Sequence, residues 1–292
     1  MAGGIGAEAL AASGLANNIF FVVAVIGFGV LSIVAPLVAA AKGQQDEQRC
    51  SRLLSNAGQI ALGLSILIMG VLLLIAANFY LFEQDPEVER LSIIYLSIIA
   101  LSSVPMLLFL AYKNFADGLS ITQPAMHVTF VCVLLNVLFN WLLIYGKLGF
   151  PALGLTGAGI ATLLSRVCMA VGIIAYVFNS QKICRYLPDF SFFRYNRDIF
   201  LKILRLGLPA GFQSVFEVGA FAGASVIVGW LGTNQLAAHQ IALNLSTVTY
   251  MVATGLPRRV YQSRRCLWRA EPNQDHPLWD SCPGAFGSIY GL

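Results

Sequence analysis

The chain has 292 residues, of which 58% are hydrophobic and 11% are charged, and its mean hydropathy is +0.75. Soluble globular domains are about 45–50% apolar and about 25% charged, so this composition excludes an ordinary soluble protein and indicates one that lies in lipid. The formal net charge of +4 does not indicate a nucleic-acid partner, because the basic residues fall between apolar runs, where they set the orientation of membrane helices.

Seven apolar segments are long enough to cross a bilayer, which takes about 20 residues per helix. They cover approximately residues 16–39, 54–82, 91–113, 124–146, 154–179, 206–230 and 235–256. The run at 60–75 is apolar on both alternating faces, whereas barrel strands alternate apolar and polar residues. We therefore predict an all-α membrane protein, a polytopic bundle of about seven transmembrane helices in the plasma or inner membrane of the cell.

The loops between the spans differ in basic content. Ten lysines and arginines lie in or beside the loops that follow the first, third and fifth spans, against two in the other loops. The positive-inside rule places the first set of loops in the cytoplasm. Met1 would then lie outside the cell although no signal peptide is visible, a difficulty that one further upstream helix would remove.

The six cysteines stand far apart, without a CxxC pair or a histidine at metal-ligand spacing. They predict neither disulfides nor a zinc site. The segment at 181–205 mixes basic and aromatic residues, which is typical of an amphipathic connector on the inner leaflet. Two prolines inside spans, Pro36 and Pro105, would free backbone carbonyls and allow the helices to bend.

An internal repeat relates the first span to the last. A shift of 226 residues aligns eight identical residues, from Gly6 with Gly232 to Gly29 with Gly255. The repeat unit is therefore six helices in the same orientation, and a complete protein would have twelve helices in two lobes. We accordingly expect an incomplete chain, with first-lobe helices at 1–180, a connector at 181–205, the first two second-lobe helices at 206–256 and a tail at 257–292.

The tail after Leu256 breaks the repeat. It crowds arginines, prolines and tryptophans together without an apolar run. A solvated cytoplasmic tail is one explanation. We favour a shifted reading frame, because advancing the frame by one nucleotide permits a nearly continuous small-apolar string over 279–291, which would suit a further helix.

Several segments together resemble the multidrug and toxic compound extrusion (MATE) family, bacterial multidrug branch. They are Leu10 to Asn18 (LAASGLANN), Gln123 to Met126 (QPAM), Leu135 to Asn140 (LNVLFN), Gly207 to Pro209 (GLP) and Leu236 to Asn244 (LAAHQIALN). The resemblance implies a two-lobed transporter that exports organic cations in exchange for Na⁺ or H⁺. The chain departs from the family pattern by lacking the first helix, with its acidic residue, and the last four.

Glu217 is the only charged residue between Arg205 and Pro257. An ionisable group at that depth costs about 2.5–3.5 kcal/mol on insertion scales, so it usually faces a cavity and marks an ion path. A carboxylic acid bonded to a neighbouring helix is the structural alternative. The resemblance matches Glu217 to the family's cation-binding glutamate, and Gln213, one turn earlier, could support it.

Asn136 and Asn140 lie four residues apart and so share one helix face. Amide oxygens can ligate Na⁺, but asparagine also joins helices by ordinary hydrogen bonds. The resemblance places a first-lobe cation site beside this pair. It implies no resident cofactor, only Na⁺ or H⁺ as the coupling ion.

Two alternatives stay open besides a cation-coupled drug antiporter. A lipid-linked oligosaccharide flippase has a similar fold but lines its cavity with several basic residues, whereas Arg166 is the only deep basic residue here. A seven-helix receptor or retinal protein would not explain the repeat. An enzyme is not expected, because no cluster of catalytic side chains lies near an interface. The expected partners are the lipid bilayer and small organic cations or drugs, with the complete protein a monomer.

Overall fold

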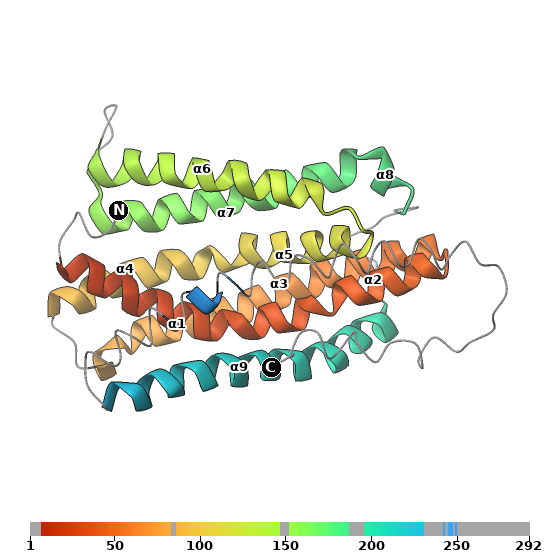
Figure 1. Ribbon diagram of the computed structural model, residues 1–292. Helices are drawn as coiled ribbons and strands as arrows, with labels where there is room; N and C mark the ends of the chain where they lie inside the picture. The colour runs from red at the N-terminus through yellow and green to blue at the C-terminus, as the bar shows by residue number, and fades with distance from the viewer. Residues whose placement is uncertain are drawn as a thin grey trace. The chain divides into compact units, whose positions relative to one another are not determined.

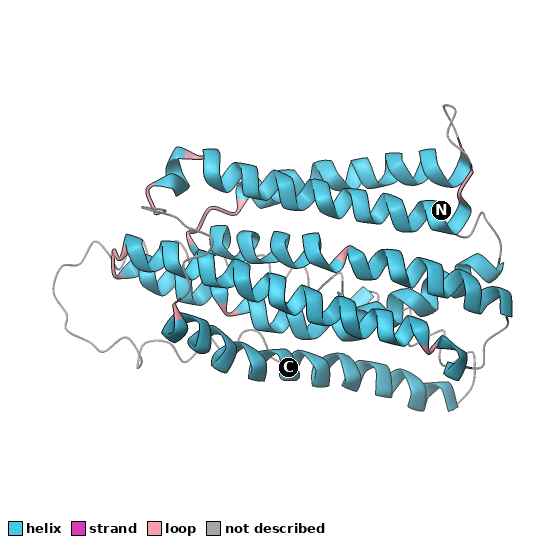
Figure 2. Ribbon diagram, turned by 180° about the vertical axis from the view of Figure 1, so that it is seen from behind, coloured by secondary structure: helices cyan, strands magenta, loops and turns pink. Residues whose placement is uncertain are grey.

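The computed structural model describes residues 7–82, 86–146, 152–186 and 196–230, together with a few residues between 242 and 249. It divides into two units, Met1–Ala222 and Gly223–Leu292. All regular structure in the described residues is helical (Figure 2). Six of these helical segments are long and apolar enough to cross a membrane, which confirms the predicted all-α membrane fold; the predicted seventh span, 235–256, lies mostly outside the described residues.

The elements follow the predicted spans closely. The first span forms α1 (Ala7–Ser32) and α2 (Val34–Gly43), and the third forms α4 (Pro86–Leu101) and α5 (Ser103–Gly118). The remaining elements are single helices: α3 (Glu47–Ala77), η2 (Phe79–Phe82), α6 (Gln123–Tyr145), α7 (Gly154–Asn179), α8 (Gln181–Cys184) and α9 (Arg197–Trp230).

Local sequence fixes several helix ends. Asp46 caps α3, since its carboxylate accepts a hydrogen bond of 2.8 Å from the Arg49 amide. Asn196 caps α9 in the same way, accepting from the amides of Asp198 and Ile199 at 3.1 and 3.2 Å. Because of this cap, α9 begins at Arg197, well before residue 206, where the apolar run begins.

Both proline-containing spans break three residues before the proline. The α1/α2 break falls at Ile33, before Pro36, and the α4/α5 break falls at Ser102, before Pro105. A proline cannot donate to the carbonyl four residues earlier and its ring crowds that turn. The helices are therefore interrupted next to the two prolines at which bending is expected.

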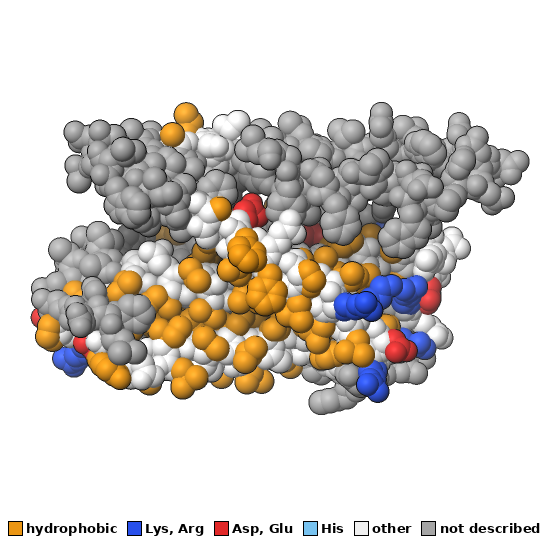
Figure 3. Space-filling view, turned by 90° about the horizontal axis from the view of Figure 1, so that it is seen from below, with side chains coloured by type: hydrophobic (Ala, Val, Ile, Leu, Met, Phe, Trp, Pro, Cys, Tyr) orange, Lys and Arg blue, Asp and Glu red, His pale blue; other side chains and the backbone are white. Residues whose placement is uncertain are grey.

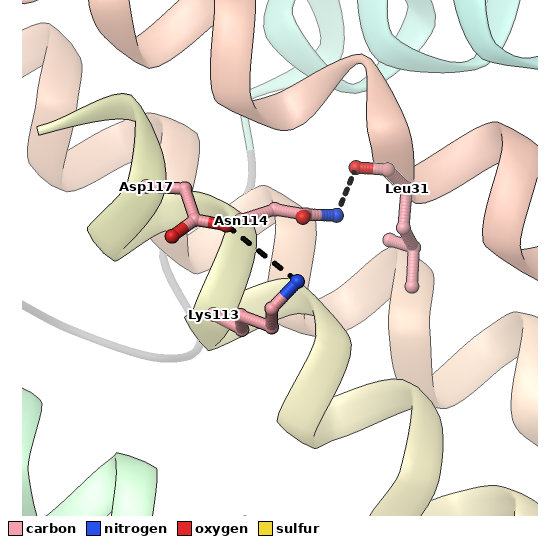
Figure 4. A network of polar contacts seen from close by, with 4 residues as sticks. All are labelled: Leu31, Lys113, Asn114 and Asp117. Atoms are coloured by element: carbon pink, nitrogen blue, oxygen red, sulfur yellow. Dashed lines mark hydrogen bonds and ion pairs between the residues drawn. The ribbon is translucent and has the colours of Figure 1, made fainter. Parts of the chain in front are cut away.

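A buried asparagine holds the first break in place. The Asn114 side-chain amide on α5 donates to the Leu31 carbonyl in the last turn of α1 at 2.9 Å (Figure 4). On the same helix, Lys113, the residue before Asn114, forms an ion pair of 3.6 Å with Asp117. The end of α1 is therefore anchored to α5 by a hydrogen bond to its backbone.

Within the first unit, α1 packs against α3 and α4, while α5 packs against α3 and α7. The core between them consists of large apolar side chains that are fully buried, among them Leu31, Leu54, Leu96, Leu107 and Phe115. In Figures 1 and 2, the α6–α7 pair lies on one side of the α1–α5 layer and α9 lies on the other. Figure 3 shows apolar side chains across the middle of one face and most of the visible lysines and arginines gathered at one end, as expected for a membrane-embedded bundle.

Glycines bring α9 close to α1. A Cβ added to Gly29 would overlap the Cα of Gly211, and one added to Gly207 would lie 2.7 Å from the Val30 carbonyl oxygen. Small residues permit this backbone approach between membrane helices.

In the second unit the structure describes the end of α9 and isolated helical residues. The Thr249 hydroxyl donates to the Leu245 carbonyl at 3.1 Å, the bond of a helical turn.

Candidate cation-coupling site

The asparagine pair on α6 forms a hydrogen-bonded network with α7. The Asn140 side-chain amide donates to the backbone carbonyl and to the side-chain oxygen of Asn136, at 2.9 and 3.0 Å. The Asn136 amide donates to the Ser165 hydroxyl at 3.2 Å, and this hydroxyl donates to the Ala161 carbonyl at 2.7 Å. The two asparagines therefore share one helix face, as their spacing predicts, and Ser165 is a third member that the sequence interpretation missed.

One side-chain oxygen of the network accepts no hydrogen bond from a described residue. The side-chain oxygen of Asn136 accepts from Asn140, whereas no described hydrogen bond reaches the side-chain oxygen of Asn140. Both asparagines are half-buried and Ser165 is buried. The arrangement can therefore join α6 to α7 by hydrogen bonds and still offer neutral oxygens to a monovalent cation.

Glu217 lies on the outer side of α9. Its side chain is exposed, as is that of Gln213 one turn earlier, and the adjacent Phe216 is 77% exposed. Neither polar side chain makes a hydrogen bond to another described residue. The face of α9 that contacts α1 is instead formed by Gly207 and Gly211, so the first unit alone does not enclose the carboxylate, and its role stays a prediction.

The structure does not bring the two predicted loci together. Asn136 and Asn140 lie on α6, which packs on α7, whereas Glu217 lies on α9. These helices are on opposite sides of the α1–α5 layer (Figure 1). The chain thus carries two separate polar loci within apolar spans.

A third polar cluster centres on Arg166 of α7. Its guanidinium donates to the Ser102 hydroxyl at 2.6 Å and lies 4.7 Å from the ring centre of Phe20, in cation–π geometry. Nearby, the Asn17 amide donates to the Tyr95 hydroxyl at 3.3 Å. Arg166 was recognised from the sequence as a deep basic residue, but its partners come from α1 and the α4/α5 break, which spacing along the chain does not reveal.

Comparison with known proteins places these features in a family. Residues 1–142 match the MatE family model. A probable multidrug resistance protein NorM from Agrobacterium fabrum is 33% identical over 254 residues, which cover 87% of this chain and 55% of the relative. The multidrug resistance protein NorM of Vibrio vulnificus is 33% identical over 252 residues, covering 86% and 55%. The chain therefore spans about half the length of the curated relatives it matches.

A solved structure agrees with these relatives. The inward-facing conformation of a multidrug resistance MATE family transporter superposes with a TM-score of 0.65 at 25% identity, over 84% of this chain and 55% of that one. These matches favour a transporter over the receptor and flippase alternatives, and the family consists of transporters rather than enzymes. With its six described membrane-spanning segments, the chain is a multi-pass protein of the cell membrane that matches the MATE family over residues 1–142 and is similar to its NorM members over most of its length.

Proposed function

We propose that this chain is part of a cation-coupled antiporter that exports drugs or other toxic organic cations. The observation that carries the proposal is Glu217, the only charged residue between Arg205 and Pro257, placed on a membrane-spanning helix. An apolar side chain at this position would insert more readily, so a functional role offsets the insertion cost. The relatives named as multidrug resistance proteins support drug export.

Glu217 acts as the coupling carboxylate of the second lobe. An ionised carboxylate can hold one proton, one Na⁺ or one organic cation, and each opposes the others because all of them neutralise the same charge. Gln213, exposed on the same side of α9, supplies a neutral oxygen or orients the carboxylate. Competition at a single charge is sufficient for antiport.

Asn136 and Asn140 act as the first-lobe polar locus, with Ser165 as their positioning partner. Their oxygens are neutral, so the charge that completes a cation site has to come from another carboxylate or from a counter-ion. Because Ser165 fixes the Asn136 amide, it determines which way the Asn136 oxygen points. We assign no resident cofactor and expect the complete transporter to act as a monomer.

The test uses a complete transporter in which residues 4–256 of this chain replace the matching part of the Agrobacterium relative. Ethidium is added outside everted vesicles, whose outer surface is the cytoplasmic face, and its entry into the lumen is followed after imposing a Na⁺ gradient, a proton gradient or neither. We expect transport to require one of the two gradients and to stop when an ionophore collapses it. Transport that persists without either gradient and depends on ATP would contradict the proposal.

A further inference from the structure

A hollow of about 260 Å³ lies where α3 and α9 begin. We call it the inner-face pocket and define it by its lining residues, Asp46, Arg49, Arg52, Asn196, Asp198, Ile199 and Lys202. It lies at the end of the bundle that the positive-inside rule assigns to the cytoplasm. Figure 3 shows a group of lysine and arginine side chains at one end of the drawn face, as expected for a cytoplasmic surface.

The pocket is held together by a buried anchor. The backbone amide of Asn196, which caps α9, donates to the side-chain oxygen of Asn56 on α3 at 3.2 Å, and Asn56 is 0% exposed. This bond fixes the start of α9 against α3. The basic residues of the two helices therefore face one hollow because this bond holds the backbones that carry them in place.

Among the described residues, the two guanidinium groups of the pocket donate to neutral amide groups. Arg49 donates to the Gln44 amide oxygen at 2.9 Å, and Arg52 donates to the Gln48 amide oxygen at 3.4 Å. The ion pairs that the structure describes, Lys113–Asp117 and Arg185–Glu47, lie elsewhere. A guanidinium bonded to a neutral amide retains its charge and has donors left for an anion.

The charge balance matches a singly charged anion. Arg49, Arg52 and Lys202 carry three positive charges, while Asp46 and Asp198 carry two negative ones. The Asp46 carboxylate is also engaged in capping α3. The net charge of one positive unit is that which one phosphodiester would neutralise.

An apolar surface continues from the pocket along α9. Leu201, Leu208 and Phe212 are 49%, 41% and 56% exposed, and their spacing of seven and four residues puts them on one side of the helix. Leu201 is the neighbour of the pocket residue Lys202. A lipid whose headgroup lies in the pocket would thus have its acyl chains beside exposed apolar side chains. A free phosphate ion has no acyl chains and would gain nothing from these side chains.

We propose that the inner-face pocket binds the phosphodiester of an anionic phospholipid of the cytoplasmic leaflet. Basic pockets between membrane helices on this side are suited to anionic headgroups. Such a lipid would bridge α3 and α9, the last helix of the first unit, and so stabilise their contact. The proposal does not depend on the transport activity, because it concerns the chain as it stands.

The experiment measures lipid retention by the purified 292-residue chain. The protein is incubated in mixed micelles with phosphatidylglycerol or with phosphatidylcholine, delipidated by a fixed wash, and analysed for bound lipid by native mass spectrometry. The parent chain is expected to retain phosphatidylglycerol preferentially. Each removed cation weakens retention by about fivefold, so Arg49→Gln with Arg52→Gln should lower it by about 25-fold.

Two matched variants make the result decisive. Arg90→Gln removes a basic residue from the opposite membrane face and should leave retention unchanged. Asp198→Asn removes a carboxylate from the pocket and should raise retention, a change in the direction that misfolding would not produce. Equal retention of the two lipids by the parent chain, or equal effects of the Arg90 and Arg49/Arg52 substitutions, would overturn the proposal.

A competition arm distinguishes a lipid from a soluble phosphate. Excess inorganic phosphate is added before the wash at constant ionic strength. We expect phosphatidylglycerol to stay bound, because its acyl chains remain on the apolar surface of α9. Displacement by inorganic phosphate, with no displacement by chloride, would show a site for soluble phosphate and overturn the assignment to a lipid.

Discussion

The layer of α1 to α5 and the flanking helices α6 and α9 differ in how much of their surface the described residues cover. The most apolar part of the first span is 44% buried, whereas the corresponding parts of α6 and α9 are each 17% buried. The candidate coupling residues, Asn136, Asn140 and Glu217, all lie on these two less covered helices. The covered layer serves as a scaffold, whereas Glu217 is exposed on α9 and the asparagine pair of α6 is half-buried and bonded to Ser165 of α7.

This difference predicts that substitutions in the covered layer reduce stability, whereas substitutions of the coupling residues reduce transport at unchanged stability. Free energies of unfolding can be compared on the purified chain by reversible SDS unfolding in mixed micelles, followed by far-ultraviolet circular dichroism.

The largest effect is expected at the contact between α1 and α9. Gly29→Ala should lower the free energy of unfolding by about 3 kcal/mol, because its Cβ would overlap the Gly211 backbone and the two helices would have to separate. Gly219→Ala is the matched control on α9, since a Cβ there has no neighbour within 4 Å. If the two variants have the same free energy of unfolding, the close packing of α1 on α9 is wrong.

A smaller loss is expected at the α4/α5 break. Ser102→Ala removes the hydroxyl that accepts from Arg166 at 2.6 Å, and a hydrogen bond to a charged group contributes about 1.5–3 kcal/mol. The comparison variant is Ser214→Ala on α9, whose hydroxyl donates to the Ala210 carbonyl within its own helix at 3.1 Å and to no other described residue. A loss at Ser214 as large as that at Ser102 would remove the distinction between covered and flanking helices.

The smallest loss within the covered layer is expected for Asn114→Ala. This variant loses the hydrogen bond to the Leu31 carbonyl, which between membrane helices contributes about 0.6–2 kcal/mol. Asn140→Ala on α6 loses bonds within one helix, and i,i+4 pairs of this kind contribute about 0.2–0.5 kcal/mol. The same unfolding measurement compares the two, and a greater cost at Asn140 would argue that α6 belongs to the scaffold.

The sequence predicts the helices better than it predicts their contacts. Apolar length alone places the fifth span at 154–179, the bounds of α7, and Pro36 and Pro105 indicate the helix breaks. The start of α9 was missed because its first turns are polar and only the Asn196 cap marks them. The Arg166–Ser102 bond and the glycine contact of α1 with α9 join residues far apart in the chain, so local patterns carry no signal for them.

At the candidate site too, the sequence predicts the geometry within a helix but not the contacts between helices. The spacing of Asn136 and Asn140 predicts their common face, because helix geometry is local. Ser165 could not be added from the sequence, since its contact with Asn136 depends on how α7 rotates against α6. For Glu217, the rarity of charge in a span indicates a function, but no described residue encloses the side chain.

The most direct test of the account is Glu217→Gln in the complete transporter, because it keeps the shape of the side chain and removes its charge. Ethidium transport is measured in everted vesicles at equal expression, beside the parent and Ser214→Ala, and the unfolding free energy of the same variants is measured on the purified chain. We predict that Glu217→Gln reduces gradient-driven transport to the level of vesicles without transporter while the unfolding free energy stays that of the parent. Transport equal to that of the parent, with the same dependence on Na⁺ or the proton gradient, would show that Glu217 is structural and contradict the account.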